Sequence, residues 1–149
     1  MERHDTLAAI ERAMIAIRRS QSRRSLSRLA TPGDQTVFGV LDALEELGRP
    51  ATVGEVGTAL GVDQPRASRL VARAVDQSLV VRRADQRDGR RTPLALTELG
   101  RAQLAAAHRT RQEAFAGAMA DWPEQDRATF ARLLTSFTTA LTGRAGHPE

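Results

Sequence analysis

The stretch TVGEVGTALGVDQPRASRLVARAV, residues 52–75, decides the fold. Thr52 and Glu55 have the spacing of a capping box, in which each side chain accepts a hydrogen bond from the other residue's backbone N–H. A short helix is therefore predicted after Thr52, and Gly61 is expected to end it. Asp63 then has the residue type of a second N-cap. The stretch predicts two short helices joined by a tight turn, which is a helix-turn-helix.

The second of these helices is predicted to be amphipathic. Pro65 fits its first turn, where the missing N–H of proline leaves no helical hydrogen bond unmade. Apolar residues recur at helical spacing and predict a buried face made of Ala67, Leu70, Val71 and Ala74. The opposite face is polar and basic, and consists of Gln64, Pro65, Arg66, Ser68, Arg69 and Arg73.

A β-hairpin is predicted immediately after the second helix. Residues 79–81 form a short apolar run, and Leu94 and Leu96 alternate with other residues in a return strand. Pro93 places this strand at an edge, because proline has no N–H to donate to a central ladder. Gly89 lies near the tip between the strands, where we expect it to take a positive φ.

Longer helices are predicted on both sides of this central unit, over residues 6–29, 35–47, 97 to about 120 and 123 to about 141. The first and the last two carry apolar faces at helical spacing. A chain of 149 residues can bury one such face, so burying three is most simply achieved by an intertwined two-fold dimer. Packing all three faces within one chain is the alternative.

The basic residues are concentrated around the helix-turn-helix and the hairpin. All 22 are arginines, and the formal net charge is +4. Residues 64–91 hold eight of these arginines against three acidic residues. Such a patch is typical of nucleic-acid binders, because the planar guanidinium suits phosphates and guanine edges. Genome composition is an alternative source of the overall arginine bias, but position carries more information than the total.

The composition excludes several classes of protein. Without cysteine there is no disulfide framework, thiol nucleophile or zinc–thiolate site. No apolar run approaches the ~18 residues of a membrane span, and the N-terminus lacks the features of a signal peptide, so we expect a cytoplasmic protein that does not contact membranes. A Ser-His-Asp set, paired carboxylates, a phosphate loop and H-E-x-x-H are not evident, which argues against an enzyme.

These motifs resemble those of the MarR family of bacterial transcriptional regulators, over about residues 6–142. The family pattern T-x-x-E-L-A-x-x-L-G-V-S corresponds to TVGEVGTALGVD, and QPRASRLVARAV follows as the recognition helix. The later family patterns G-L-V-x-R, D-x-x-D-x-R and L-T-x-x-G correspond, in the same order, to SLVVR, DQRDGR and LTELG. Three features depart from the pattern, namely Ser78 in place of the preferred glycine, the pair Ala74-Val75, and Pro93 in the return strand.

The resemblance implies a mainly α fold with a small β-hairpin wing, in a single domain over residues 1–149. Residues 35–100 would form a winged helix-turn-helix lobe, and residues 6–29 and 101–142 the dimerisation helices. The implied function is that of a homodimeric DNA-binding regulator, without a cofactor, that represses its own or adjacent genes at a palindromic operator in double-stranded DNA. A winged-helix adaptor or antirepressor that binds protein is the alternative, although arginines in place of apolar residues on the wing do not favour it.

The resemblance places the basic face of the second helix in the major groove. Arg66 and Arg69 lie three residues apart on this face, and we expect one of them to read guanine. Which of the two does so stays open. Gln64 is expected at adenine and Arg73 at a phosphate, and the backbone N–H groups near Val53 are further candidates for a phosphate.

The resemblance places the hairpin tip in the minor groove. Arg90, by its place in D-x-x-D-x-R, is expected to enter that narrow and electronegative groove. Arg87 and Arg91 are expected to contact phosphates. A solvated charge is the alternative for each of these arginines. The residues expected to hold the tip in shape beforehand are Asp85, Asp88 and Gly89.

Members of the family often bind small amphipathic molecules, frequently phenolic or anionic, between the dimerisation helices and the DNA-binding lobe. The resemblance permits such an effector here, and Met14, Arg18 and Phe38 are the candidate pocket residues. A metal site is not expected, and His108 is interpreted as an ordinary surface or interface residue. The three histidines of the chain are His4, His108 and His147.

Overall fold

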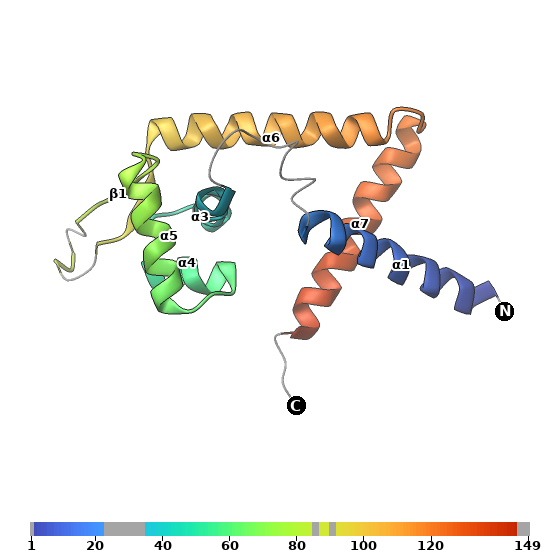
Figure 1. The fold of residues 1–149 in the computed structure, drawn as a ribbon, viewed down its shortest axis with the longest axis horizontal. Coiled ribbons are helices and arrows are strands. Elements are labelled where there is room, and N and C mark those ends of the chain that lie inside the picture. The colour runs from blue at the N-terminus through green and yellow to red at the C-terminus, as the bar shows by residue number, and fades with distance from the viewer. Residues whose placement is uncertain (1, 23–34, 85–86, 90–91, 146–149) are drawn as a thin grey trace. The chain divides into compact units, whose positions relative to one another are not determined.

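The computed structural model describes residues 2–22, 35–84, 87–89 and 92–145. Their fold is mainly α-helical with a two-stranded hairpin, so the predicted fold class is confirmed (Figure 1). The chain divides into two compact units, Met1–Gln112 and Glu113–Glu149. In chain order the elements are α1 (Glu2–Ser22), α3 (Gln35–Leu47), α4 (Val53–Leu60), α5 (Gln64–Asp76), β1 (Val80–Arg82), β2 (Leu94–Leu96), α6 (Glu98–Ala118) and α7 (Glu124–Ala145).

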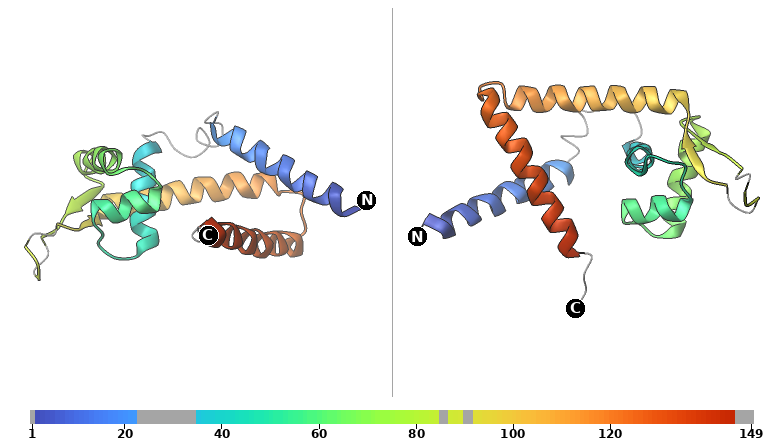
Figure 2. Two further views of the ribbon diagram at one scale, coloured as in Figure 1. Left: turned by 90° about the horizontal axis from the view of Figure 1, so that it is seen from below. Right: turned by 180° about the vertical axis from the view of Figure 1, so that it is seen from behind.

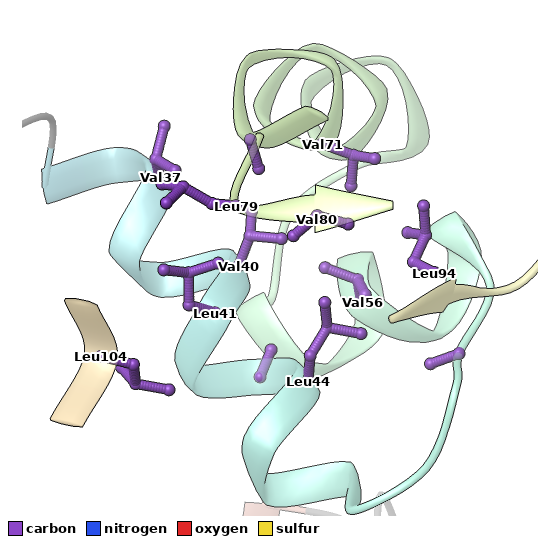
Figure 3. Packing of buried hydrophobic residues seen from close by; sticks show 13 residues of the cluster. Val37, Val40, Leu41, Leu44, Val56, Val71, Leu79, Val80, Leu94 and Leu104 are labelled. Carbon is purple, nitrogen blue, oxygen red and sulfur yellow. The ribbon is translucent and has the colours of Figure 1, made fainter. Parts of the chain in front are cut away.

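A hydrophobic core surrounds α3 in the first unit (Figure 3). Val37, Val40 and Leu41 of α3 are fully buried. α4 and α5 pack against α3 and against each other, and Figure 2 shows the three helices gathered beside the hairpin. Burying a side chain of this size contributes roughly 1.5–3 kcal/mol, so the core fixes the helix-turn-helix on α3. The other large side chains of the core are Leu44, Val56, Val71, Leu79, Val80, Leu94 and Leu104.

The ends of α4 and α5 have the caps that the sequence predicts. Thr52 Oγ1 accepts a hydrogen bond from the Glu55 N–H at 3.2 Å, and Glu55 Oε1 accepts one from the Thr52 N–H at 3.4 Å. Gly61 ends α4 with a left-handed φ of 66°. The Asp63 carboxylate accepts from the N–H of Arg66 at 2.9 Å and starts α5. Local hydrogen bonds and one glycine therefore set the turn between the two helices.

The first strand of the hairpin begins at Val80, not at Leu79 as the sequence predicts. The N–H of Leu79 donates to the carbonyl of Ala74 at 3.0 Å, where α5 ends. Leu79 therefore completes the helix end instead of joining the strand, although its side chain is buried. From Val80, which lies opposite Leu96, β1 pairs with β2 in antiparallel register.

The predicted return strand is confirmed as β2, and its outer edge is partly covered. Pro93 lies just before β2 and its carbonyl accepts from the N–H of Arg83 at 2.8 Å. On the side away from β1, Ala51 and Leu94 exchange two backbone hydrogen bonds, of 3.0 and 2.7 Å. This bridge ties the segment before α4 to the base of the hairpin, a contact that the sequence does not predict.

Gly89 does not take the positive φ that the sequence predicts, so this expectation is wrong. A Cβ on Gly89 would meet nothing within 4 Å. The strands stop at Arg82 and Leu94, and the connection between them exceeds a two-residue turn. Because a longer loop can reverse through several residues, it does not need a left-handed glycine at this position.

Ser78 takes a left-handed φ of 60°, which no other non-glycine residue in the described part of the chain does. Its N–H donates to the carbonyl of Val75 at 2.9 Å, and its carbonyl accepts from Thr97 Oγ1 at 2.6 Å. These hydrogen bonds hold Ser78 between the end of α5 and the start of α6. A left-handed backbone costs an L-residue about 1–2 kcal/mol, which the glycine of the MarR pattern avoids.

Replacing Ser78 with glycine is expected to raise the free energy of unfolding by about 1 kcal/mol. The substitution removes the Cβ that disfavours the left-handed backbone, and this gain exceeds the added entropy of the unfolded chain. Urea unfolding followed by circular dichroism measures the change. Ser78→Ala keeps the Cβ and serves as the matched control. Equal stability of the glycine and alanine variants would show that the backbone at Ser78 is unstrained.

Polar contacts join α6 to α3. The Arg111 guanidinium donates to the Asp42 carboxylate at 3.3 Å and to Nδ1 of His108 at 3.0 Å. Because Nδ1 accepts this bond, the proton of a neutral imidazole lies on Nε2, which is 2.6 Å from Glu45 Oε2. Leu104, one turn before His108, is buried in the core. The first half of α6 therefore belongs to the packed lobe.

The same contacts bear on the interpretation of His108. The ligand atoms of Asp42, Glu45 and His108 lie within 4.8 Å of one another, close enough for a metal ion. A ligating His108 would have to give up its Nε2 proton, and Asp42 would have to release Arg111. The observed hydrogen bonds thus favour a structural role for His108 between two helices.

The second unit contains the turn between α6 and α7. The Arg127 side chain donates to the carbonyl of Met119 at 2.7 Å, just beyond the C-terminal end of α6. The ring of Trp122 meets the ring of Phe130 edge to face, with their centroids 5.4 Å apart. α7 is confirmed, but it begins at Glu124, one residue after the predicted start, and it continues to Ala145, beyond the predicted end near residue 141.

α1 and α7 expose apolar side chains. α1 begins at Glu2, not at residue 6 as predicted, and the predicted helical residues 23–29 lie outside the described part of the chain. Leu7 on α1 is 66% exposed and Leu133 on α7 is 52% exposed. The single chain therefore leaves apolar helical faces open to water. The other exposed large apolar residues of these two helices are Ile10, Met14, Ile15, Ile17, Phe130, Leu134, Phe137 and Leu141.

Candidate nucleic-acid interface

α5 presents the predicted polar and basic face to solvent. Ala67, Val71 and Ala74 are fully buried and fix the helix on the core, whereas Leu70, predicted to be buried with them, is only partly buried. The core contacts thus orient the rest of the helix outward. The predicted outward residues are all exposed, namely Gln64, Pro65, Arg66, Ser68, Arg69 and Arg73.

Arg66 and Arg69 have side chains that are open to a ligand. Both lie in the first half of α5, and both are exposed. Within the described residues, neither guanidinium forms an ion pair or a hydrogen bond. A guanidinium in this state presents a planar set of N–H donors that matches a phosphate or the O6 and N7 atoms of guanine.

Arg73 is held more closely to the protein. Its Nη1 donates to Thr36 Oγ1 at 3.3 Å, so the side chain bridges the last turn of α5 and the start of α3. A side chain that is already ordered loses less rotamer entropy when it meets a ligand. The position suits a contact at the edge of the basic face.

The N-terminus of α4 combines free helical N–H groups with a neutralised carboxylate. Arg49 forms a hydrogen-bonded ion pair with Glu55. The hydrogen bond from Arg49, followed by that from the Thr52 N–H, lowers the pKa of the Glu55 carboxyl. The carboxylate is thus ionised at neutral pH, with its charge offset by Arg49. The N–H groups of Val53 and Gly54, which precede the capped N–H of Glu55, keep the orientation that favours an anion.

Gln64 connects this helix end to α5. A Cβ built on Gly54, in the first turn of α4, would lie 3.7 Å from Gln64 Oε1. The Gln64 side chain therefore lies beside the N-terminus of α4. The structure brings together the two places, the start of α4 and the exposed face of α5, where the sequence predicts DNA contacts.

The wing is described in part. Arg87, Asp88 and Gly89 are exposed, and Arg87 and Asp88 both take part in polar interactions. Asp85, Arg90 and Arg91 lie outside the described residues. The minor-groove role of Arg90 and the orienting role of the two aspartates therefore stay predictions.

The sequence motifs predict no DNA contact for two arginines at the base of the wing. Arg82 ends β1 and Arg83 follows it, and both are exposed. Neither forms an ion pair with another residue in the ranges that the structure describes. Consecutive residues of an extended segment alternate between faces, so the sequence pattern predicts Arg82 and Arg83 on opposite sides of the hairpin. That alternation is the signal in the sequence that could have found them.

The three candidate effector-pocket residues have different surroundings. Phe38 is partly buried and packs against the hydrophobic core. Met14 is 37% exposed on α1, and Arg18 on the same helix is exposed and takes part in a polar interaction. The effector pocket stays a prediction.

Comparisons with known proteins agree with this architecture. A model of the MarR family matches residues 34–91. YxaD of Bacillus subtilis (strain 168), an uncharacterized HTH-type transcriptional regulator, is 29% identical over 108 residues, which cover 72% of this chain and 75% of YxaD. A MarR family protein from Bacillus stearothermophilus has a TM-score of 0.79 at 23% identity and covers 93% of this chain and 97% of that one. A mutant MarR from E. coli has a TM-score of 0.68 at 22% identity and covers 85% and 94%.

The capped helix pair, the exposed basic helix and the hairpin define a winged helix-turn-helix DNA-binding protein. Over residues 34–91 the chain is similar to the MarR family of transcriptional regulators, and its fold is that of solved MarR family structures. In the part of the chain that the structure describes, no helix is long and apolar enough to cross a membrane.

Proposed function

We propose that this regulator binds a palindromic operator in double-stranded DNA as a homodimer and represses its own or adjacent genes. The exposed basic face of α5, with the open guanidinium groups of Arg66 and Arg69, carries the proposal. In a winged helix this helix enters the major groove, where a guanidinium can donate two hydrogen bonds to guanine. Gln64 contacts adenine, and Arg73 and the N–H groups near Val53 contact phosphates.

The proposed dimer is supported by the apolar faces of α1 and α7. Side chains such as Leu7, Leu133 and Leu141 are about half exposed or more in the single chain, at 66%, 52% and 50%. A second copy related by a two-fold axis would bury the same faces on both chains. Two recognition helices related in this way read two half-sites about one helical turn, roughly 34–36 Å, apart.

In the proposed complex the tip of the wing completes the contact. Arg90 enters the minor groove, and Arg87 and Arg91 meet the flanking phosphates. Asp85, Asp88 and Gly89 hold the tip in shape. A small amphipathic effector that binds near Met14, Arg18 and Phe38 releases the DNA.

Replacing Arg90 with alanine is expected to weaken operator binding by about 1–3 kcal/mol, because the side chain loses its contact in the electronegative minor groove. Fluorescence anisotropy with the intergenic DNA beside the gene, at two salt concentrations, measures the change. The wild-type chain should bind one dimer per palindrome, with a steep salt dependence. Arg109→Ala, an exposed position on α6, is the control. Unchanged binding by Arg90→Ala would remove Arg90 from the interface and keep the regulator.

The adaptor function makes a different prediction for the same protein. An apolar protein contact is insensitive to salt, whereas a contact with phosphates releases counterions and weakens steeply as salt rises. If a genome-wide selection with the purified protein recovers no preferred duplex, operator binding is excluded and the adaptor function takes its place.

A further inference from the structure

A cavity of about 400 Å³ lies between the C-terminal end of α3, the hairpin and the start of α6. None of the residues predicted to contact DNA lines it. Its lining includes the guanidinium-bearing side chains of Arg49, Arg83 and Arg101, which come from three separate segments of the chain. Because three positively charged side chains line one cavity, the partners of their charges decide what the cavity can bind.

Two of the charged groups in the lining already have partners. Arg49 is paired with Glu55. The single acidic residue of the lining, Glu45, accepts a hydrogen bond from His108 at 2.6 Å. Arg83 and Arg101, in contrast, form no ion pair or side-chain hydrogen bond with any described residue. The lining therefore contains two guanidinium groups, those of Arg83 and Arg101, that have no partner among the described residues.

The remaining lining is apolar. Leu44 and Ala95 are buried, at 4% and 8% exposure, and line the cavity together with the partly buried Leu96. Pro50 adds a further apolar surface to the lining. Sites for small molecules combine such apolar walls with a few convergent charged groups. The lining thus suits a ligand with a compact apolar body and an acidic end.

We propose that this cavity binds a small organic dianion, either a phosphate monoester or a dicarboxylate, through Arg83 and Arg101. A dianion matches these two guanidinium groups, because each can donate paired hydrogen bonds to a phosphate or carboxylate. A monoanion would leave one guanidinium without a partner, and a cation would be repelled. The apolar body of the ligand lies against Leu44, Ala95 and Leu96.

The site is separate from the DNA-contacting surface but is built on the same elements. Arg83 directly follows β1 at the base of the wing, and Arg101 lies in the first turn of α6. The Ala51–Leu94 bridge holds the hairpin beside the segment that contains Pro50. A bound dianion would tie the wing base to α6 through two charge-assisted contacts.

Isothermal titration calorimetry in the absence of DNA tests the proposal. The probes are phenyl phosphate and phthalate, which are the two kinds of dianion, and benzoate, which has the same ring with one charge. We expect one site per chain for at least one of the dianions. Benzoate should bind at least about tenfold more weakly than that dianion. The stronger of the two dianions identifies the acidic group that the site prefers.

Arg83→Gln and Arg101→Gln should each weaken dianion binding about tenfold or more, because each removes one charged partner. Arg109→Gln, an exposed arginine of α6 outside the lining, is the matched control and should bind as the wild-type chain does. Thermal melts of the three variants should coincide, since none of these side chains has a partner to lose in the described structure.

Two results would overturn the proposal. One is the absence of saturable binding for both dianions, and the other is equal binding by the wild-type chain and both glutamine variants. If the dianions fail to bind while Arg83→Gln and Arg101→Gln weaken DNA binding, the two arginines contact the DNA backbone instead. Because dianion binding is measured without DNA, its outcome is independent of operator binding.

Discussion

Replacing Gly100 with alanine is expected to destabilise the winged-helix lobe by on the order of 3 kcal/mol, the upper end of the range for overpacking. A Cβ at this position would overlap the carbonyl oxygen of Leu79, well inside the 3.0 Å that real Cβ atoms keep. The carbonyl cannot simply move away, because it accepts a hydrogen bond from the Thr97 N–H at 3.1 Å. Urea unfolding followed by circular dichroism measures the loss.

Gly117→Ala is the matched control for this prediction. Gly117 lies near the other end of α6, and a Cβ there would meet nothing within 4 Å. Alanine in a helix is more stable than glycine by about 0.8–1.0 kcal/mol, so this variant should be neutral or slightly stabilised. If Gly100→Ala unfolded at the same urea concentration as the wild-type chain, the close approach of α6 to Leu79 would not exist in solution.

The junction around Gly100 also explains the L-T-x-x-G pattern in physical terms. Thr97 Oγ1 donates to the Ser78 carbonyl at 2.6 Å and accepts from the Gly100 N–H at 3.0 Å. One threonine thus caps the start of α6 and holds the end of α5, while the glycine makes room for the Leu79 carbonyl. Thr97 and Gly100 therefore act together: both allow the start of α6 to pack closely against the end of α5.

The double substitution of Arg66 and Arg69 by alanine is expected to weaken operator binding by about 2–5 kcal/mol and to leave folding unchanged. Both side chains are exposed, and neither has a partner among the described residues, so no internal interaction is lost. Loss of a base contact removes sequence preference, whereas loss of a phosphate contact lowers the salt dependence. Anisotropy titrations at several salt concentrations separate these effects.

The single variants then identify which arginine reads a base. A variant that lacks the base-reading arginine should bind the operator and a duplex changed at one guanine with similar affinity. A variant that lacks the phosphate-contacting arginine should bind both duplexes more weakly by the same factor. Arg109→Ala serves as the control for a general loss of positive charge. Operator binding of wild-type strength by the double variant would show that α5 is not the recognition helix.

Sequence patterns predicted the elements that depend on near neighbours. The capping box of Thr52 and Glu55, the helix end at Gly61 and the Asp63 cap involve residues at most four apart, and all are confirmed. Three of the four residues of the predicted buried face of α5, Ala67, Val71 and Ala74, are confirmed for the same reason, since helical spacing fixes which side chains point together.

Features that join distant segments could not be predicted in this way. The predicted start of β1 is wrong because the N–H of Leu79 donates to a carbonyl at the end of α5. The Ala51–Leu94 bridge was not predicted, because it joins segments that are far apart in the sequence. The cavity that contains Arg83 and Arg101 exists only once the hairpin and α6 have packed on α3. The sequence shows only that Ser78 departs from the glycine of the MarR pattern. It gives neither the sign of φ at this residue nor the energetic cost of the left-handed backbone.

The apolar faces of α1 and α7 have a consequence for how this protein should melt. Under the proposed assembly, folding and association are one equilibrium, so the concentration of chains enters the unfolding constant. The midpoint of thermal unfolding should then rise as the protein is concentrated, and dilution alone should unfold a fraction of the chains. A chain that buried its own helices would melt at one temperature at every concentration. For this regulator, the amount of protein in the cell would set both operator occupancy and the fraction of chains that survive as folded protein.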